Sequence, residues 1–291
     1  MTAHSSSLPP SIHPRRVGLI FAFLRAVPLT LALGLPGCAS DDLQADSALD
    51  YSENAKREYE RGMRALESGN WEGVDELMNE VRRKYAYSRY ARLAELRLSD
   101  ANYKQEKFAE AISGYKSFVH DYPNDPEVPY ARYWVAKSQY DSVSQSTLLP
   151  PLEERDLASV NDALDSIQNY LGDYPTSPYR NELGYMLAVV MGLLARHELY
   201  VARFYLREDN FKAAVNRVEF ALKTFTRSGL EPEALVLLGE IYMKQKDGTK
   251  ARGALQRVLR EYPDSAFTLP AKNLLAQLGP ETSAPAPAAK P

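Results

Sequence analysis

One side chain in this sequence stands in a setting that suits covalent chemistry: Cys38, the only cysteine of the chain. A single thiol excludes an intramolecular disulfide and a cluster of thiolates around a metal. Leu35 lies three positions before it, Gly37 directly precedes it, and the apolar stretch 26–35 follows three arginines. A stretch of this length is too short to span a bilayer and is typical of a secretory signal that ends in a lipobox. We therefore expect cleavage after residue 37 and a covalent lipid on Cys38, rather than a buried cysteine.

Details of this N-terminal segment leave alternatives open. The pair Arg15-Arg16 is also compatible with a twin-arginine signal, and Pro36 is unusual inside a lipobox. Ala39 follows the cysteine, where an aspartate would favour retention in the inner membrane. We expect an anchor in the outer membrane, on its periplasmic face.

Patterns typical of catalysis are absent from the rest of the sequence. Outside the first 37 residues there are two histidines, His120 and His197, and no HExxH motif, phosphate-binding glycine loop or GxSxG turn. The chain has 35 Lys and Arg against 38 Asp and Glu, and cleavage would remove three of the arginines. A mildly acidic surface disfavours nucleic acid as a partner. We expect no enzyme, and no metal or cofactor beyond the lipid.

The remaining chemistry is recognition by tyrosine and arginine side chains in the N-terminal half. Tyrosines are so dense there that they cannot all be buried at helical spacing, and exposed ones offer flat apolar contact with a polar tip. Basic residues gather nearby, from Arg82 to Lys84 and beyond, and suit a peptide carboxylate or simply the end of a helix. The candidate pocket for a client peptide comprises Tyr87, Tyr90, Tyr103, Tyr130, Arg89 and Arg92.

Five copies of one helical pattern must position these residues. Each copy closes on an aromatic residue, preceded by apolar or small residues 4, 7 and 11 positions earlier, which lie on one face of a helix. The closing aromatics are Tyr85, Tyr122, Tyr174, Phe225 and Tyr262, spaced by 37, 52, 51 and 37 residues. The position eleven back is alanine in four copies, where a neighbouring helix must come close. Periods near 34 residues are typical of tetratricopeptide repeats. The predicted fold is an all-α tetratricopeptide-repeat solenoid of five helical hairpins with a C-terminal capping helix.

The predicted organisation follows from this register. Residues 1–37 form a signal peptide and 38–50 a flexible tether. Residues 51–150 contain repeats one and two and the first part of repeat three. Residues 151–279 contain the remainder of repeat three, repeats four and five and the cap. The tail 280–291 is rich in Pro and Ala and is expected to be disordered. Pro150-Pro151 predicts an extended segment, and the long helix expected at 179–206 should protrude beyond the repeats.

One stretch carries a family resemblance. His197 to Leu206 reads HELYVARFYL, and Phe211 to Val218 reads FKAAVNRV. This stretch resembles the segment E-x-x-V-A-x-Y-Y … A-x-x-N-R of the BamD family, lipoproteins of the bacterial outer-membrane β-barrel assembly machinery, with Phe204 in place of the first aromatic. The similarity extends over 51–278.

The resemblance implies a scaffold with two binding halves. The N-terminal repeats would receive unfolded outer-membrane proteins by their C-terminal strand signal. The C-terminal repeats would dock on the periplasmic domain of BamA, with Arg217, Asn216 and Glu198 at the contact, and other Bam lipoproteins would join. An internal salt bridge of Arg217 to Glu198 is the alternative for that arginine. A tetratricopeptide lipoprotein that coordinates cell-wall synthesis or pilus and secretin assembly is the alternative for the whole chain.

Overall fold

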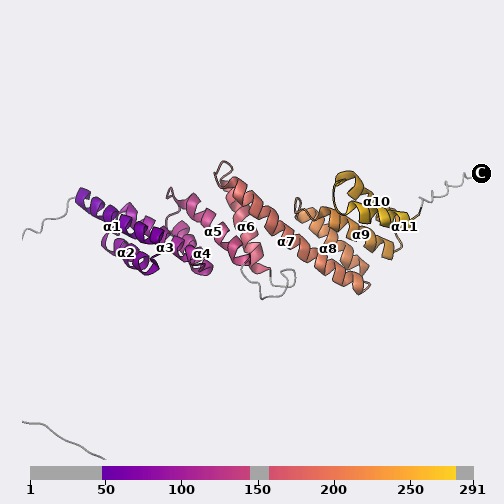
Figure 1. Ribbon diagram of the computed structural model, residues 1–291, viewed down its shortest axis with the longest axis horizontal. Helices are drawn as coiled ribbons and strands as arrows, with labels where there is room; N and C mark the ends of the chain where they lie inside the picture. The colour runs from indigo at the N-terminus through magenta and orange to yellow at the C-terminus, as the bar shows by residue number, and fades with distance from the viewer. Residues whose placement is uncertain (1–47, 145–156, 280–291) are drawn as a thin grey trace, which may run out of the picture. The chain divides into compact units, whose positions relative to one another are not determined.

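The helices of the structure follow one another as antiparallel pairs (Figure 1). The computed structural model describes residues 48–144 and 157–279, and every regular element in these two ranges is a helix. In chain order the elements are α1 (Ala48–Ser68), α2 (Trp71–Lys84), α3 (Arg89–Lys104), α4 (Phe108–Asp121), α5 (Val128–Ser144), α6 (Ala158–Asp173), α7 (Arg180–Arg207), α8 (Phe211–Thr224), α9 (Glu231–Lys244), α10 (Gly248–Glu261) and α11 (Thr268–Gln277). Five hairpins and a final helix confirm the predicted all-α solenoid. Helix α1 begins at Ala48, inside the segment predicted as a tether.

Several predictions concern residues outside the described ranges. These are the signal peptide and lipobox, the acylation of Cys38, the extended segment at Pro150-Pro151 and the disorder of the tail 280–291. They stay predictions.

The second helix of each hairpin buries the predicted face. The residues 4, 7 and 11 positions before the closing aromatics are at most 3% exposed in all five copies. The four alanines of the series, Ala111, Ala163, Ala214 and Ala251, are fully buried. Burial at this spacing confirms the register that the sequence predicted, and it means that each second helix contributes one apolar stripe to the core.

The closing aromatics end these helices. In each copy the backbone N–H of the aromatic donates to the carbonyl four residues earlier, and its own carbonyl then accepts from the N–H three residues later. That later residue is Ser88, Asp125, Ser177, Ser228 or Ser265. Each of their side-chain oxygens accepts a backbone N–H of the next first helix or of the turn before it. The repeat is thus an aromatic residue followed at the third position by a Ser or Asp whose side chain accepts a backbone N–H and so holds the turn into the next helix, a pattern that the sequence reading missed.

The turns inside the hairpins rely on left-handed backbone. Gly69 adopts a φ of 73°, as expected for glycine at the end of a helix. The corresponding turns of three other hairpins use Glu106, Asp209 and Lys246 at φ values from 53° to 64°. An L-residue in this region costs about 1–2 kcal/mol. Side-chain caps at Asn70, Asn210 and Asp247 directly follow in three of these turns and help to hold them.

Helix α7 differs from the prediction that it protrudes beyond the repeats. Its buried side chains run from Leu183 to Ala202, nearly its full length of 28 residues. The N-terminal half packs on α6, and the C-terminal half packs on α8 (Figure 1). The helix is long because it serves both neighbours, so its extra turns are buried on one side.

The apolar core continues across the predicted boundary at residues 150 and 151. Tyr133 and Val143 of α5 share one buried cluster with residues of α6 to α10. At the far end α11 buries Ala271 against Leu235 and Leu255, which agrees with its predicted role as a cap.

Candidate partner-binding surfaces

Two of the three residues predicted to contact BamA bind each other. The guanidinium Nη1 of Arg217 on α8 lies 3.1 Å from Oε2 of Glu198 on α7. The Glu198 side chain is 11% exposed and that of Arg217 is 44% exposed. Helical spacing puts Glu198 on the buried face of α7, between Ala195 and Ala202. The arginine therefore neutralises a nearly buried carboxylate, while its own side chain stays partly exposed, so its predicted contact with BamA stays a prediction. The alternative, an internal salt bridge, is what the structure contains.

The solvent side of the same helix pair carries exposed polar and aromatic side chains. Asn216 is exposed beside Arg217. One turn further along α8, Phe220 is 48% exposed and contacts Phe225 edge to face. On α7, Phe204 and Tyr200 are also exposed large side chains. An exposed aromatic residue next to an amide is a composition typical of protein interfaces.

The predicted client pocket is divided among different places. Tyr87 is 96% exposed in the turn between α2 and α3. Tyr90 packs on Tyr59 of α1, with the Arg89 guanidinium over its ring. Arg92 forms an ion pair with Asp125 at 2.9 Å. These four residues therefore lie in three different environments: an exposed turn, an aromatic contact and an ion pair.

The other two predicted tyrosines do come together. Tyr103 of α3 and Tyr130 of α5 both contact the indole of Trp134, with ring centroids 4.6 Å and 6.0 Å away. The Tyr103 hydroxyl donates to Asp141. Burial, followed by the hydrogen bond to Asp141, raises the pKa of Tyr103, so it remains a neutral donor. Half of the predicted tyrosines thus form one aromatic cluster on the first helices of repeats two and three.

A buried carboxylate beside this cluster was missed by the sequence reading. Asp100 is 6% exposed and accepts hydrogen bonds from the hydroxyls of Tyr115 and Tyr130 and from Nη1 of Arg97. The indole Nε1 of Trp134 and the Nε of Arg97 are buried and have no hydrogen-bond partner among the residues that the structure describes. The spacing of Arg97 and Asp100 by three residues on one helix was the available signal.

A second polar link joins α5 to α7. Glu182 accepts hydrogen bonds from the Tyr133 hydroxyl at 2.8 Å and from Lys137 Nζ at 3.1 Å. Burial opposes ionisation of Glu182, but these two hydrogen bonds outweigh it and lower its pKa. The ring of Tyr133 also stacks on Tyr179 at 3.8 Å. The first helices of repeats three and four, α5 and α7, are therefore linked by the ionised carboxylate of Glu182. This link weakens when Glu182 is protonated at acidic pH.

The basic cluster in the last turn of α2 borders a cleft of about 470 Å³. Its lining residues are Asn79, Arg82, Arg83, Ala86, Ala91, Glu95 and Tyr122. Glu95 pairs with Arg82 at 3.3 Å, whereas Arg83 forms no ion pair with a carboxylate that the structure describes. Lys84 pairs with Glu80 on its own helix. Of the three basic residues Arg82, Arg83 and Lys84, Arg83 is therefore the one whose guanidinium is available to bind an anionic group in the cleft.

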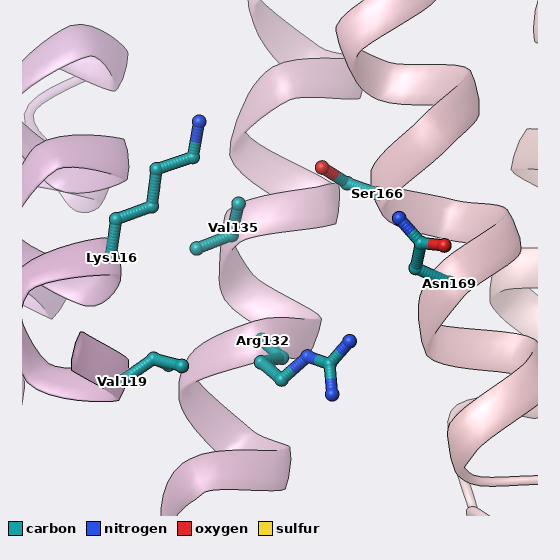
Figure 2. A pocket seen from close by; sticks show the side chains of 6 residues that line it. All are labelled: Lys116, Val119, Arg132, Val135, Ser166 and Asn169. Carbon is teal, nitrogen blue, oxygen red and sulfur yellow. The ribbon is translucent and has the colours of Figure 1, made fainter. Parts of the chain in front are cut away.

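A smaller pocket of about 170 Å³ lies between α4, α5 and α6. Figure 2 shows Lys116 and Val119 on one side and Ser166 and Asn169 on the other. Arg132 lies between them and pairs with Asp173 at 2.7 Å. The volume suits about five or six water molecules, and no predicted site residue lines it.

The described residues contain no group of three His, Cys, Asp or Glu side chains that could hold a metal ion. Within the same part of the chain, α7 is long and apolar enough by composition to cross a membrane. A core helix of a soluble protein passes the same test, and α7 buries Leu183, Leu194 and Leu199 in the apolar core.

Comparison with known proteins was made by sequence and by structure. A family model described as "YfiO: Outer membrane lipoprotein" matches residues 52–252. The outer membrane protein assembly factor BamD of Xylella fastidiosa is 27% identical over 209 residues, 71% of this chain and 72% of that protein. BamD of Haemophilus influenzae is 27% identical over 82% of this chain and 90% of that protein. A tetratricopeptide structure of yeast Sti1 aligns with 12% identity over 78% of this chain and 83% of that chain, at a TM-score of 0.40.

The family match covers the first four hairpins and the start of the fifth. It includes both helices of the Glu198–Arg217 pair and the aromatic cluster around Trp134. Since it extends over more than half of the sequence, it shows that the chain belongs to the YfiO family of outer membrane lipoproteins, the family of the assembly factor BamD.

Proposed function

We propose that this protein is a non-catalytic scaffold of the outer-membrane protein assembly machinery, held at the periplasmic face of the outer membrane by a lipid on Cys38. The observation that carries the proposal is the family match over residues 52–252, together with relatives named as assembly factors over most of their length. The repeat architecture supports it, because stacked hairpins present extended surfaces to partners. The C-terminal repeats dock on the periplasmic domain of BamA, and the N-terminal repeats receive clients.

The contact with BamA uses the solvent side of α8. Arg217 is engaged by Glu198, so the groups available to a partner are Asn216, Phe220 and the exposed part of the guanidinium. Truncating an interface residue near the centre of a contact typically costs more than about 1–2 kcal/mol of binding free energy. A salt-bridged arginine at such a contact is also held in place before binding, which lowers the entropy cost.

The test is capture from detergent-solubilised envelopes with the tagged full-length protein. We expect wild type to recover BamA and the other Bam lipoproteins, and Asn216→Arg to recover at least tenfold less BamA. The matched control is Asn273→Arg on α11, which is also exposed and should behave as wild type. Recovery of a cell-wall synthase or a secretin in place of BamA would favour the rival function.

The client contact places the C-terminal carboxylate of an unfolded outer-membrane protein in the cleft beside Arg83. Its terminal aromatic side chain then packs against Ala86 and Tyr122, which line the same cleft. An arginine without an internal ion pair loses no other interaction when it binds a carboxylate, and charge-assisted hydrogen bonds are stronger than neutral ones.

A synthetic peptide that ends in phenylalanine tests this assignment. We expect Arg83→Glu to weaken binding of the free-carboxylate peptide at least fivefold and to change binding of the amidated peptide much less. Arg64→Glu on α1 is the control, since it also reverses an exposed charge. Equal loss for both peptides would contradict the carboxylate contact and leave BamA docking unaffected.

A further inference from the structure

A groove of about 800 Å³ lies along the N-terminal half of α7. Its walls are the C-terminal part of α6 and the turn after α8. Its lining includes Leu171, Arg180, Gly184, Ala188, Met191 and Arg227. The predicted client and BamA residues take no part in it.

The groove exists because α7 is longer than its partner. Helix α7 has 28 residues, whereas α8 has 14. Ala195 and Glu198 lie on the stripe of α7 that α8 covers. On α8, Ala221 lies near Ala195, and Arg217 pairs with Glu198. The same stripe continues toward the N-terminus through Met191, Ala188 and Gly184, at helical spacing. Beyond the end of α8 this stretch is no longer covered, so it forms the floor of the groove.

The floor is shaped for close approach by a helix. A side chain built at Gly184 would meet no atom within 4 Å, so there is open space above it, and Ala188 lies one turn further along. Leu171, Leu187 and Met191 supply apolar surface and are only partly buried against the core. Small residues flanked by larger apolar ones allow ridges of a second helix to pack into this surface.

An arginine stands at each end of the floor. Arg180 opens α7, and its guanidinium donates to a backbone carbonyl of the preceding turn. Arg227 lies in the α8–α9 turn, which crosses α7 at Gly192, where the Ser228 carbonyl is 3.3 Å from a Cβ built on the glycine. Neither guanidinium forms an ion pair with a carboxylate in the described ranges. The two positions are about 18 Å apart along α7, from the helix rise per residue.

We propose that this groove docks an amphipathic helix of about three turns from a protein partner, laid end to end with α8 and carrying acidic residues at both ends. Twelve residues of helix span the same length as the floor. Carboxylates at its ends pair with Arg180 and Arg227, and its apolar face covers the leucines and Met191. Two guanidinium groups that form no ion pair in the described ranges favour an acidic occupant over a basic one; the Glu231 carboxylate accepts the backbone N–H of Arg227 rather than its side chain. This site is separate from the α8 surface proposed for BamA.

The probe for a test is a synthetic 14-residue helix-forming peptide with Leu and Ala on one face and two Glu residues at each end. Its counterpart carries Lys at the ends. Binding to the purified full-length protein in detergent is measured by fluorescence anisotropy. We expect the acidic peptide to bind at least tenfold more tightly than the lysine peptide.

Two substitutions locate the binding. Gly184→Trp fills the groove and should weaken binding of the acidic peptide at least tenfold. Gly253→Trp on α10, where an added side chain also meets open space, is the matched control and should change the affinity less than twofold. Arg227→Glu should abolish the preference for the acidic peptide. A circular dichroism melt of each variant shows that the fold is retained.

Three results would overturn the proposal. The first is unchanged affinity of a folded Gly184→Trp variant, and the second is equal binding of the two peptides to wild type. The third is absence of peptide binding at millimolar concentration. If the protein then self-associates in sedimentation and Gly184→Trp removes this, a second copy of the chain occupies the groove, and the proposal is overturned as well. Normal recovery of BamA by Gly184→Trp is expected in every case, so failure here is distinct from failure of the proposed function.

Discussion

The Glu198–Arg217 ion pair should contribute measurably to stability, and Arg217→Ala tests this. The substitution leaves a carboxylate whose side chain is 11% exposed without the partner that lies 3.1 Å away. A buried polar group without a partner costs about 1–3 kcal/mol. Because the arginine side chain is 44% exposed, water screens part of the interaction, and we expect the lower part of that range, about 1–2 kcal/mol. For a domain of this size the melting temperature should fall by about 2–8 °C.

Urea and thermal unfolding of five variants measure the effect: Arg217→Ala, Glu198→Gln, the double variant and two controls. Lys223→Ala is the control, since it removes an exposed cation from the same helix that has no described ion pair. Glu198→Gln removes the buried charge, so the double variant should be less destabilised than the sum of the single changes by at least about 0.5 kcal/mol. Wild-type stability of Arg217→Ala, or strict additivity in the double variant, would refute the reasoning. Asn216→Arg should leave the melt unchanged, which separates docking from folding.

Further predictions concern the core, the turns, the α5–α7 link and the anchor. Ala214→Leu overfills a fully buried position and should cost about 1–3 kcal/mol; an unchanged melting temperature would contradict the helix register. In Gly69→Ala the added methyl group fits without a clash but places an L-residue at a φ of 73°. We therefore expect about 1 kcal/mol of destabilisation, measured by urea unfolding. The pKa of Glu182 is lowered on folding, so its stabilisation is present at neutral pH and lost as the pH falls below about 4. Glu182→Gln should therefore destabilise more at pH 7 than at pH 3, and equal effects at both pH values would exclude this link. Cys38→Ser should lose labelling by a clickable fatty acid and leave the outer-membrane fraction, whereas equal labelling of both proteins would contradict acylation.

Local patterns explain why the helices could be predicted so closely. The apolar spacing before Tyr122 or Tyr262 is set by residues within one helix, and the turns at Gly69 and Asn210 are set by neighbours in sequence. These interactions act over fewer than about four turns, so a single sequence contains them in full. The Ser or Asp three residues after each closing aromatic acts equally locally. It was missed because the sequence reading followed the apolar residues before each aromatic and not the polar residues after it.

Recognition residues were predicted less well, because exposure and pairing depend on neighbours from other helices. Tyr103 and Tyr130 meet because α3 and α5 lie side by side around Trp134. Tyr87 is an equally plausible tyrosine in the sequence, yet it lies in a turn and touches none of these rings. Arg92 was predicted to bind a client peptide, and in the structure it pairs with Asp125, which is 33 positions away in the sequence.

The amino-acid sequence by itself determined the five hairpins, their register and the family, because each rests on periodicity or on a motif within one segment. Only the tertiary structure decided which charges are already used. It paired Arg217 with Glu198, buried Asp100 among tyrosine hydroxyls and left Arg180 and Arg227 at the ends of an open groove. The physical reason is that an ion pair or a groove is formed by side chains from separate helices, and their distance depends on how those helices pack.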